Sequence, residues 1–317
     1  MRTYLDFEKP IAELESKVAE LKVLAAGQRS VPIVEELAKL EAKAREALEE
    51  TYSELTPWQK TQVARHPERP HFNHYVDGLV EDFTLLAGDR YFGEDEAIIG
   101  GIGRLQGRSA MIIGHEKGSD TEGRIKHNFG MARPEGYRKA LRLMEMADRF
   151  SLPVVSLVDT AGAYPGIGAE ERGQAEAIAR CTDCCLRLGV PIVSVIIGEG
   201  GSGGAVAIAS ANRVYMLEHA IYTVASPEAA ASILWRDSSR AVDAATNMKI
   251  TAQDLLKLGI IDGIIPEPVG GAHRDGRGVV LAAGEVIGKA LAAFDAMPPE
   301  AIRKARREKF IAIGRAG

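Results

Sequence analysis

A glycine-rich stretch between Pro191 and Ala209 contains the residues of this sequence best suited to chemistry. The segment 192–197 is apolar and mostly β-branched, which is typical of a strand buried on both faces. Five glycines follow within the seven residues 198–204, and a run of small apolar residues after them predicts a short helix. The free N–H groups at the start of such a helix favour an anion, either a bound one or one that forms during a reaction.

The first interpretation of this stretch is a dinucleotide-binding turn. The spacing Gly198-x-Gly200-x-x-Gly203 matches the fingerprint, and Glu218 stands near the position of a ribose-binding acid. Two features argue against it. Only the nine residues 202–210 remain for the helix, and another strand and helix precede the motif in the sequence.

The second interpretation is the nucleophile elbow of a serine hydrolase. The spacing Gly200-x-Ser202-x-Gly204 fits that motif, and Asp262 and His273 follow in the order that a Ser, Asp, His triad would have. A structural alternative is that the Ser202 hydroxyl caps the helix that it opens. Aspartate and histidine occur downstream in any long chain, so the order alone carries little weight.

The third interpretation is an oxyanion hole built from backbone alone. In it, the N–H groups of Gly203 and Gly204 hold an oxyanion and no side chain forms a covalent bond. A tight structural corner would need one or two glycines. Five within seven residues exceed that need, which favours a functional site.

A second loop follows the preceding strand. The segment 153–158 is rich in valine and ends in Asp159, Ala161 and Gly162, after which a glycine-bearing loop continues to Gly168. Ligands bind at the carboxyl ends of parallel strands, so we expect this loop and the glycine stretch to face one cleft. Asp159 could act as a general base or simply cap the loop.

The predicted elements alternate between strand and helix, which implies an α/β fold with parallel pairing. Between them we expect a long polar loop at 114–136. A basic terminal helix should expose Arg303, Lys304, Arg306, Arg307 and Lys309 to solvent. Strands are expected at 97–105, 109–116, 153–158, 192–197, 213–217, 221–224 and 260–266, and helices at 77–86, 135–150, 173–188, 227–235, 237–246, 251–258 and 279–297.

The first part of the chain predicts a helical arm. Apolar residues recur at intervals of three and four within residues 10–50, and the break at 27–32 allows two amphipathic helices to fold back on each other. Thr56 and Pro57 predict the start of a third helix. We therefore divide the chain into an arm over 1–70 and a main domain over 71–317.

Composition limits the function further. The 317 residues are 46% hydrophobic and carry a net charge of −5, which is unlike a dedicated nucleic-acid binder. No long apolar run and no signal sequence are present, so we expect a cytoplasmic protein without membrane contact. Cys181, Cys184 and Cys185 lie on one face of a predicted helix, where buried thiols are a simpler interpretation than a metal site.

Four long segments together resemble the alpha subunits of bacterial acetyl-CoA carboxylase carboxyltransferases. They are residues 128–179, the turn IGEGGSGGA at 197–205, VASPEAAASILWRD at 224–237 and LGIIDGIIPEPVGGAHRD at 258–275. The likeness covers essentially the whole chain. Residues 258–266 of the last segment also resemble the wider crotonase superfamily, which implies a spiral of ββα units; here we expect that spiral to follow the N-terminal helical arm.

The resemblance implies a reaction and its partners. The alpha subunit is expected to assemble with a zinc-ribbon-bearing beta subunit as α₂β₂ and to hold carboxybiotin, which is carried on a separate biotin carboxyl carrier protein and loaded by biotin carboxylase. The carboxyl group would pass to acetyl-CoA and give malonyl-CoA for fatty acid synthesis. Gly203 and Gly204 would then be catalytic, and Gly200, Gly201, Ser202, Ala161 and Gly162 would contact the cofactor.

The resemblance also sets two expectations about what this chain lacks and one about a basic loop. A zinc ribbon needs four cysteines, so the three here imply no metal in this chain. A crotonase-type hydratase would need a pair of positioned carboxylates, which the sequence does not reveal. The loop with Arg124, Lys126, His127 and Arg133 could meet coenzyme A phosphates, and solvated loop charges are the plainer alternative.

Overall fold

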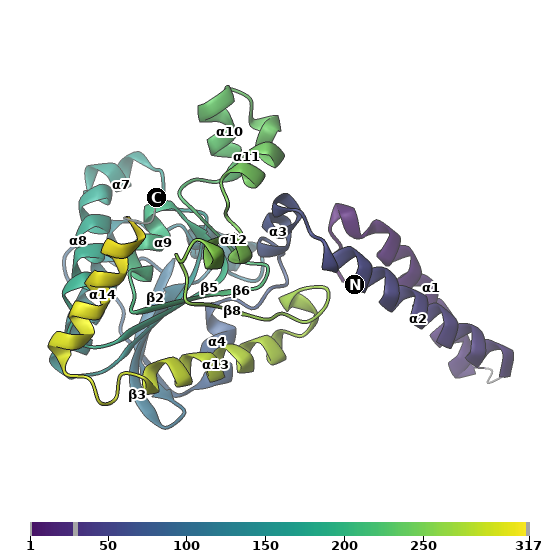
Figure 1. The fold of residues 1–317 in the computed structure, drawn as a ribbon, viewed down its shortest axis with the longest axis horizontal. Helices are drawn as coiled ribbons and strands as arrows, with labels where there is room; N and C mark the ends of the chain where they lie inside the picture. The colour runs from purple at the N-terminus through teal and green to yellow at the C-terminus, as the bar shows by residue number, and fades with distance from the viewer. Residues whose placement is uncertain (1, 28–30, 315–317) are drawn as a thin grey trace.

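The computed structural model describes residues 2–27 and 31–314 and has an 8-stranded mixed sheet at its centre (Figure 1). Across the sheet the order is β1-β2-β3-β4-β5-β6-β8, and β7 pairs with β5 outside this path. Pairing is antiparallel from β1 to β3 and parallel from β3 onward, as the α/β pattern predicts. The strands are β1 (Val80–Leu85), β2 (Ile98–Leu105), β3 (Arg108–His115), β4 (Val154–Thr160), β5 (Ile192–Gly201), β6 (Arg213–Leu217), β7 (Ile221–Thr223) and β8 (Gly263–Ile265).

The helices lie close to their predicted positions over most of the chain. Short 3-10 turns occur at Asp6–Glu8, Asn128–Gly130, Ser238–Arg240 and Ala272–Arg274. The α-helices are α1 (Lys9–Gly27), α2 (Val31–Ser53), α3 (Pro57–Ala64), α4 (Phe72–Leu79), α5 (Thr121–Lys126), α6 (Pro134–Arg149), α7 (Ile167–Glu171), α8 (Gln174–Arg187), α9 (Ser202–Ala209), α10 (Pro227–Trp235), α11 (Ala241–Asn247), α12 (Ala252–Lys257), α13 (Gly276–Ala292) and α14 (Pro299–Ile313).

Helices cover both faces of the sheet. A Cβ atom at Gly100 would meet Leu143 of α6, whereas a Cβ atom at Gly114 would meet Phe72 of α4. Gly100 lies opposite Ile113 in the β2–β3 pair, and neighbouring residues of a strand point to opposite faces. It follows that α6 and α4 pack on opposite sides of the sheet.

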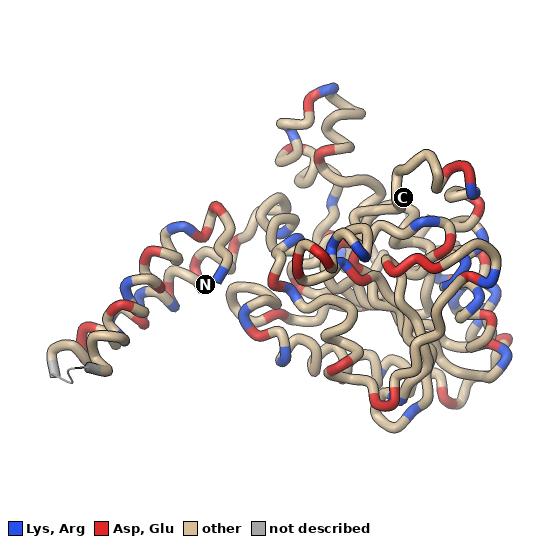
Figure 2. The backbone as a smooth tube through the Cα atoms, turned by 180° about the vertical axis from the view of Figure 1, so that it is seen from behind, with Lys and Arg blue, Asp and Glu red and all other residues tan. Residues whose placement is uncertain are grey.

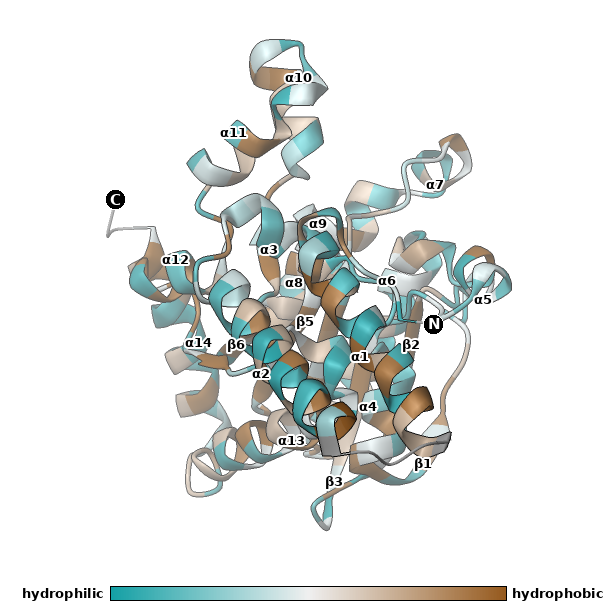
Figure 3. Ribbon diagram, turned by 90° about the vertical axis from the view of Figure 1, so that its right-hand side faces the viewer, coloured by the Kyte–Doolittle hydropathy of each residue, from teal (hydrophilic) through white to brown (hydrophobic). Residues whose placement is uncertain are grey.

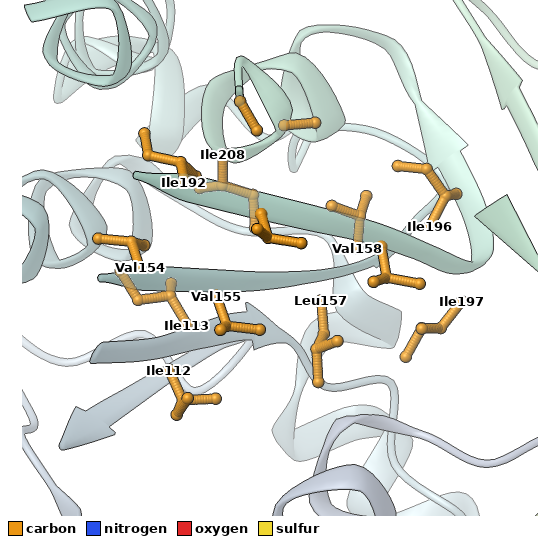
Figure 4. Packing of buried hydrophobic residues seen from close by; sticks show 14 of the residues in the cluster. Ile112, Ile113, Val154, Val155, Leu157, Val158, Ile192, Ile196, Ile197 and Ile208 are labelled. Carbon is orange, nitrogen blue, oxygen red and sulfur yellow. The ribbon is translucent and has the colours of Figure 1, made fainter. Parts of the chain in front are cut away.

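The core lies on β3, β4 and β5 (Figure 4). Every residue of β4 and β5 is buried, and Val155 and Ile196 are at most 1% exposed. Burying such a side chain stabilises a fold by about 1.5–3 kcal/mol. The central strands are therefore rigid supports for the loops at their carboxyl ends.

The edge of the sheet contains a tight turn and a bulge, and each depends on residues with a positive φ. The turn between β2 and β3 has Gln106 and Gly107 with φ of 51° and 77°, as a two-residue hairpin requires. In β1, by contrast, the predicted helix over 77–86 is wrong. A bulge between Glu81 and Thr84 adds one residue, with Asp82 at a φ of 52°, so Val80 and Phe83 share a face at a helix-like spacing of three.

The long loop predicted at 114–136 is only partly a loop. It contains α5 and a 3-10 turn, and Asp120 accepts a hydrogen bond from the Gly123 N–H at 2.7 Å as the cap of α5. Polar residues in this segment therefore serve as caps as well as solvent-exposed positions.

The N-terminal helices α1 and α2 project from the body as an antiparallel pair (Figure 1). Acidic and basic residues alternate along both helices (Figure 2), and Lys22 binds Glu41 at 2.8 Å. The predicted connection at 27–32 lies largely outside the described residues. Helix α3 precedes residue 70 but packs on β5 and α11 of the main body. The division of the chain at residue 70 stays a prediction.

The three thiols are buried, and none forms a disulfide. Burial raises the pKa of Cys184 and of Cys185 to about 12, so both stay neutral as small apolar groups. Within the described ranges, no group of three or more histidine, cysteine or acidic side chains is arranged to hold a metal ion. Among the same residues, no helix is both long and apolar enough to cross a membrane.

The basic terminal helix is not a uniformly solvated face, because Arg306 is fully buried. Its guanidinium donates to the carbonyl oxygens of Leu188 and Val190 at 2.9 and 2.6 Å, to that of Cys185, and to Oδ1 of Asn212. Burial lowers the pKa of Arg306 to about 10. This side chain therefore fastens α14 to the end of α8, a role that the spacing of charges does not reveal.

We expect Arg306→Ala to lower the free energy of unfolding by about 3 kcal/mol, because buried carbonyl oxygens would lose their donor. Urea unfolding monitored by circular dichroism measures the change. Arg307→Ala is the matched control, since Arg307 is the next residue of the same helix and is exposed. Equal stability of the two variants would contradict the role given to Arg306.

Candidate active site at the glycine segment

The glycine segment is positioned by a bulge in β5. The β4–β5 register runs to Val158 opposite Ile196 and resumes at Thr160 opposite Gly200. Three residues of β5, 197–199, therefore lie opposite the single residue Asp159. Such a bulge bends a strand and leaves ladder groups without their usual partners.

Two buried side chains satisfy those ladder groups. The Glu199 N–H donates to Oδ1 of Asp159 at 2.9 Å, and the Ile197 carbonyl accepts from Nε and Nη2 of Arg69 at 3.2 and 3.0 Å. Arg69 is itself held by Glu267 through bonds of 2.8 and 2.7 Å. The bulge is thus fixed from both sides by charged groups that lie inside the protein.

β5 changes partners at the bulge. Residues 193–196 pair with β6, and residues 199–201 pair with β7. The strand continues through the glycines to Gly201, and α9 begins directly at Ser202. The prediction of a separate glycine turn at 198–204 is therefore wrong, because Gly198, Gly200 and Gly201 belong to the strand.

The glycines of the segment permit close packing against the loop after β4. A Cβ atom at Gly201 would overlap the carbonyl oxygen of Ala161. One at Gly204 would lie 2.9 Å from the backbone of Gly162, and one at Gly162 would lie 3.7 Å from Cβ of Ser202. The predicted proximity of the two loops is therefore confirmed, and Ala161 and Gly162 directly contact the glycine segment.

Ser202 is not the helix cap. Gly201 occupies the cap position, and no side-chain hydrogen bond caps this end of α9. Ser202 is the first helical residue and has a φ of 57°, a left-handed conformation that costs a serine about 1–2 kcal/mol. The abrupt change from strand to helix requires this strained backbone.

The first N–H groups of α9 are free to bind a ligand. In an α-helix the first four N–H groups have no acceptor within the helix. In the described part of the chain, no hydrogen bond is formed by the N–H of Gly203 or of Gly204. Gly203 is half-buried and lines a pocket, whereas Gly204 is buried behind it.

Two hollows flank the segment. The apolar pocket, of about 550 Å³, is lined by Gly203, Val206, Tyr222, Val224, Leu255 and Leu258 among others. The charged pocket, of about 390 Å³, includes Arg65, His71, Lys117, Arg124, Asp159 and Glu199 in its lining. Ala161 lines the charged pocket, and Ser202, which follows Gly201 in the chain, lines the apolar pocket.

Asp159 is a poor candidate for a general base. Burial alone would raise its pKa, but Lys117 at 2.7 Å and His71 outweigh burial and hold the pKa well below its usual range. Glu199 is likewise lowered in pKa, against its burial, by Lys117 and Arg65. Asp159 remains ionised and accepts the N–H of Glu199 in the neighbouring strand, so its carboxylate holds the bulge of β5 instead of capping the loop that follows β4.

The hydrolase and dinucleotide interpretations both fail on geometry. Asp262 binds the Val214 N–H at 2.7 Å, at the amino end of β6, whereas Ser202 follows the carboxyl end of β5. His273 stacks on His66 with ring centroids 3.7 Å apart. The Glu218 carboxylate accepts from the N–H of Glu267 at 3.0 Å, so it is engaged within the protein.

The basic loop does not form one cluster. Of its four predicted residues only Arg124 lines the charged pocket. Lys126 binds Glu96 at 2.7 Å, His127 binds the Glu96 carbonyl at 2.6 Å, and the Arg133 guanidinium stacks on the ring of Tyr164. Phosphate binding by the four together is therefore not supported.

Sequence reasoning missed Arg69, Lys117 and Glu199. Lys117 follows the end of β3, and Glu199 is the one acidic residue within the glycine segment. A charged residue at the carboxyl end of a buried strand must find a partner inside the protein, and that signal could have identified both. Arg69 lies in an irregular segment far away in sequence, and nothing local indicates its contact with β5.

We expect Gly201→Ala to lower the free energy of unfolding by about 3 kcal/mol, the upper end for overpacking. The backbone angles of Gly201 suit alanine, so only the overlap with Ala161 is tested. Thermal and urea unfolding measure the effect. Gly93→Ala is the control, because nothing lies within 4 Å of its added Cβ atom. A neutral Gly201→Ala would contradict the close packing of the two loops.

The comparisons with known proteins agree with this geometry. A family model described as acetyl co-enzyme A carboxylase carboxyltransferase-like matches residues 4–314. Over 315 residues the chain is 68% identical to the acetyl-coenzyme A carboxylase carboxyl transferase subunit alpha of Xanthobacter autotrophicus, with 99% of each chain covered. It is also 68% identical to that of Rhodopseudomonas palustris strain BisA53, covering 99% of this chain and 98% of the relative.

Solved structures match in fold at low sequence identity. The transcarboxylase 12S structure superposes with a TM-score of 0.59 at 19% identity, covering 71% of this chain and 42% of that chain. A Pseudomonas malonate decarboxylase hetero-tetramer in complex with coenzyme A gives a TM-score of 0.58 at 18% identity, with 71% and 91% covered. The crotonase-like carboxyltransferase fold predicted from the motifs is confirmed. The chain therefore belongs to the family of acetyl-CoA carboxylase carboxyltransferase alpha subunits and is part of a biotin-dependent carboxylase complex.

Proposed function

We propose that this subunit binds carboxybiotin, presented by a biotin carboxyl carrier protein, beside Gly203 and Gly204. With that cofactor bound, their N–H groups would donate to its ureido oxygen, and the cofactor would supply the carboxyl group that is transferred. The observation that carries the proposal is the pair of N–H groups without acceptors at the start of α9, next to a pocket. Each such donor contributes about 2.7–4 kcal/mol to lowering a barrier.

The residues present fit the cofactor. The apolar pocket falls within the range of about 300–1,000 Å³ that is usual for small-ligand sites. Val206 and Val224 offer apolar walls to a bicyclic ring, and Gly203 lines the same pocket. By the same proposal, Gly200, Gly201 and Ser202, with Ala161 and Gly162, hold the walls of this site in place.

The site needs no acid–base side chain of its own. When bound, biotin supplies the carboxyl group and the base that the methyl group of acetyl-CoA requires. Asp159 and Glu199 are locked in ion pairs with Lys117, so neither competes for protons. The chain contributes position and fixed dipoles, and the product of the transfer is malonyl-CoA, which is used in fatty acid synthesis.

The same edge of the molecule carries a surface for the beta subunit. The side chains of Ile167 in α7 and Ile233 in α10 are 81% and 76% exposed, and Val224, which precedes α10, is 83% exposed. These apolar side chains belong to segments that extend from the body (Figure 3). Exposed apolar groups around a site mark a protein interface, so we assign this surface to the beta subunit. The beta subunit would bind acetyl-CoA and so complete the site. The two subunits would form an α₂β₂ assembly in the cytoplasm, and biotin carboxylase would load the carrier protein.

We expect Gly203→Pro to lower the rate of carboxyl transfer about 10²- to 10³-fold, because proline removes the N–H that donates to the oxyanion. The measurement is malonyl-CoA formation by the assembled complex. Gly203→Ala is the matched control. It keeps the N–H, and its Cβ atom meets only the flexible Ile178 side chain, at 3.3 Å. Equal rates in the two variants would refute the role of this donor.

We expect the isolated chain to be inactive and to gain carboxyl transfer only with the beta subunit. Ile233→Asp should weaken assembly at least about tenfold, because it places a charge in the apolar interface. Size-exclusion chromatography measures assembly, and product formation measures activity. Val23→Asp is the control, at a side chain that is 74% exposed on the distal arm. Full turnover by the chain alone, or normal assembly of Ile233→Asp, would contradict the proposal.

A further inference from the structure

The charged pocket contributes no donor to the proposed oxyanion site, although it lies beside it. It opens at the carboxyl ends of β3, β4 and β5, where Lys117, Asp159 and Glu199 lie. Parallel sheets bind ligands at this edge. Ala161 of its lining packs against Gly201, and the next residue, Ser202, lines the apolar pocket.

Both acidic groups of the pocket are already neutralised. The Lys117 ammonium lies 2.7 Å from Asp159 and 2.9 Å from Glu199, and Arg65 binds Glu199 at 2.7 Å. Arg65 also binds Glu228 outside the pocket. Burial by itself would lower the pKa of Lys117, yet the two carboxylates raise it to about 12, so the ammonium stays charged. None of these four groups is free to bind another ion.

Two donors in the pocket remain unused. Arg124 projects from α5 and forms no ion pair with any described residue. His71 is only 5% exposed, and neither ring nitrogen has a hydrogen-bond partner among the described residues. Its Nδ1 atom lies 3.6 Å from Oδ2 of Asp159, too far for a hydrogen bond but close enough to help lower the pKa of that carboxyl. Nε2 is therefore the ring nitrogen left for a ligand. A buried imidazole without partners is costly unless a ligand satisfies it.

We propose that the charged pocket is a subsite for a small carboxylate, bound by Arg124 and His71. A guanidinium binds a carboxylate through two parallel hydrogen bonds, and an imidazole N–H can add a third. The inference rests on the proposed function, because the group that is transferred is a carboxylate both before and after the reaction.

The test is isothermal titration of the full chain with malonate, bicarbonate and sulfate at constant ionic strength. We expect one malonate to bind, with affinity lowered at least about tenfold in Arg124→Gln, since a charged hydrogen bond is lost. His71→Phe should weaken binding as well, while it keeps a ring in the same space. Lys126→Gln is the control on the same helix, because Lys126 binds Glu96 instead of lining the pocket; its affinity should be unchanged.

The outcomes separate the possible sources of the carboxylate. Malonate binding assigns the subsite to the carboxylated product, and bicarbonate binding without malonate binding assigns it to the free ion. Three results would overturn the inference. They are no saturable binding of malonate or bicarbonate, sulfate binding as tight as malonate binding, and equal malonate affinity in Arg124→Gln and the unmodified chain. The Gly203 variants test carboxyl transfer separately, so failure here is distinguishable from failure of the proposed function.

Discussion

The position of the active site depends on how the protein satisfies one backbone irregularity, the bulge at 197–199 of β5. A bulge inside a fully buried strand leaves N–H and carbonyl groups without ladder partners where water cannot reach them, and each such unpaired group costs about 1–3 kcal/mol. The Asp159 carboxylate accepts the N–H of Glu199, and the Arg69 guanidinium donates to the carbonyl oxygen of Ile197. Burial would raise the pKa of Glu267, but Arg69 lowers it to about 2, so the buried pair stays charged. A hydrophobic pair could fill the same volume but could not make these bonds.

The bulge in turn positions the backbone donors on which the proposed chemistry depends. Once it has bent β5 toward β7, the strand end meets the loop after β4 at a distance that only glycine tolerates at position 201. The strain at Ser202 is confined to the corner between a rigid strand and a helix that packs on the core. The N–H groups of Gly203 and Gly204 are therefore held before any ligand arrives, and fixed dipoles of this kind need no reorganisation during a reaction.

The sequence predicts this site better than it predicts the network that supports it. Glycine density and the alternation of strands and helices identify the strand, the short helix and the neighbouring loop, because those signals are local. The error at β1 arises because Asp82 forms a bulge that imitates a helical period. The burial of Arg306 and Arg69 cannot be predicted from the sequence, because their hydrogen-bond partners lie far away in the chain. The spacing of charged residues does not indicate which of them becomes buried. The assignment of Gly203 and Gly204 to catalysis stays a prediction.

Lys117 has an electrostatic consequence beyond holding two loops together. Without it, Asp159 and Glu199 would place negative charge in the same segment as the donors of α9. A unit charge about 8 Å from a developing oxyanion would oppose it by about 2 kcal/mol at an effective dielectric constant of 20, comparable to the contribution of one N–H donor. By sharing its ammonium between both carboxylates, Lys117 lets the bulge use the Asp159 carboxylate as a structural acceptor while the field at Gly203 stays favourable to an anion. The ion pairs thus reconcile a buried acidic scaffold with a reaction that accumulates negative charge.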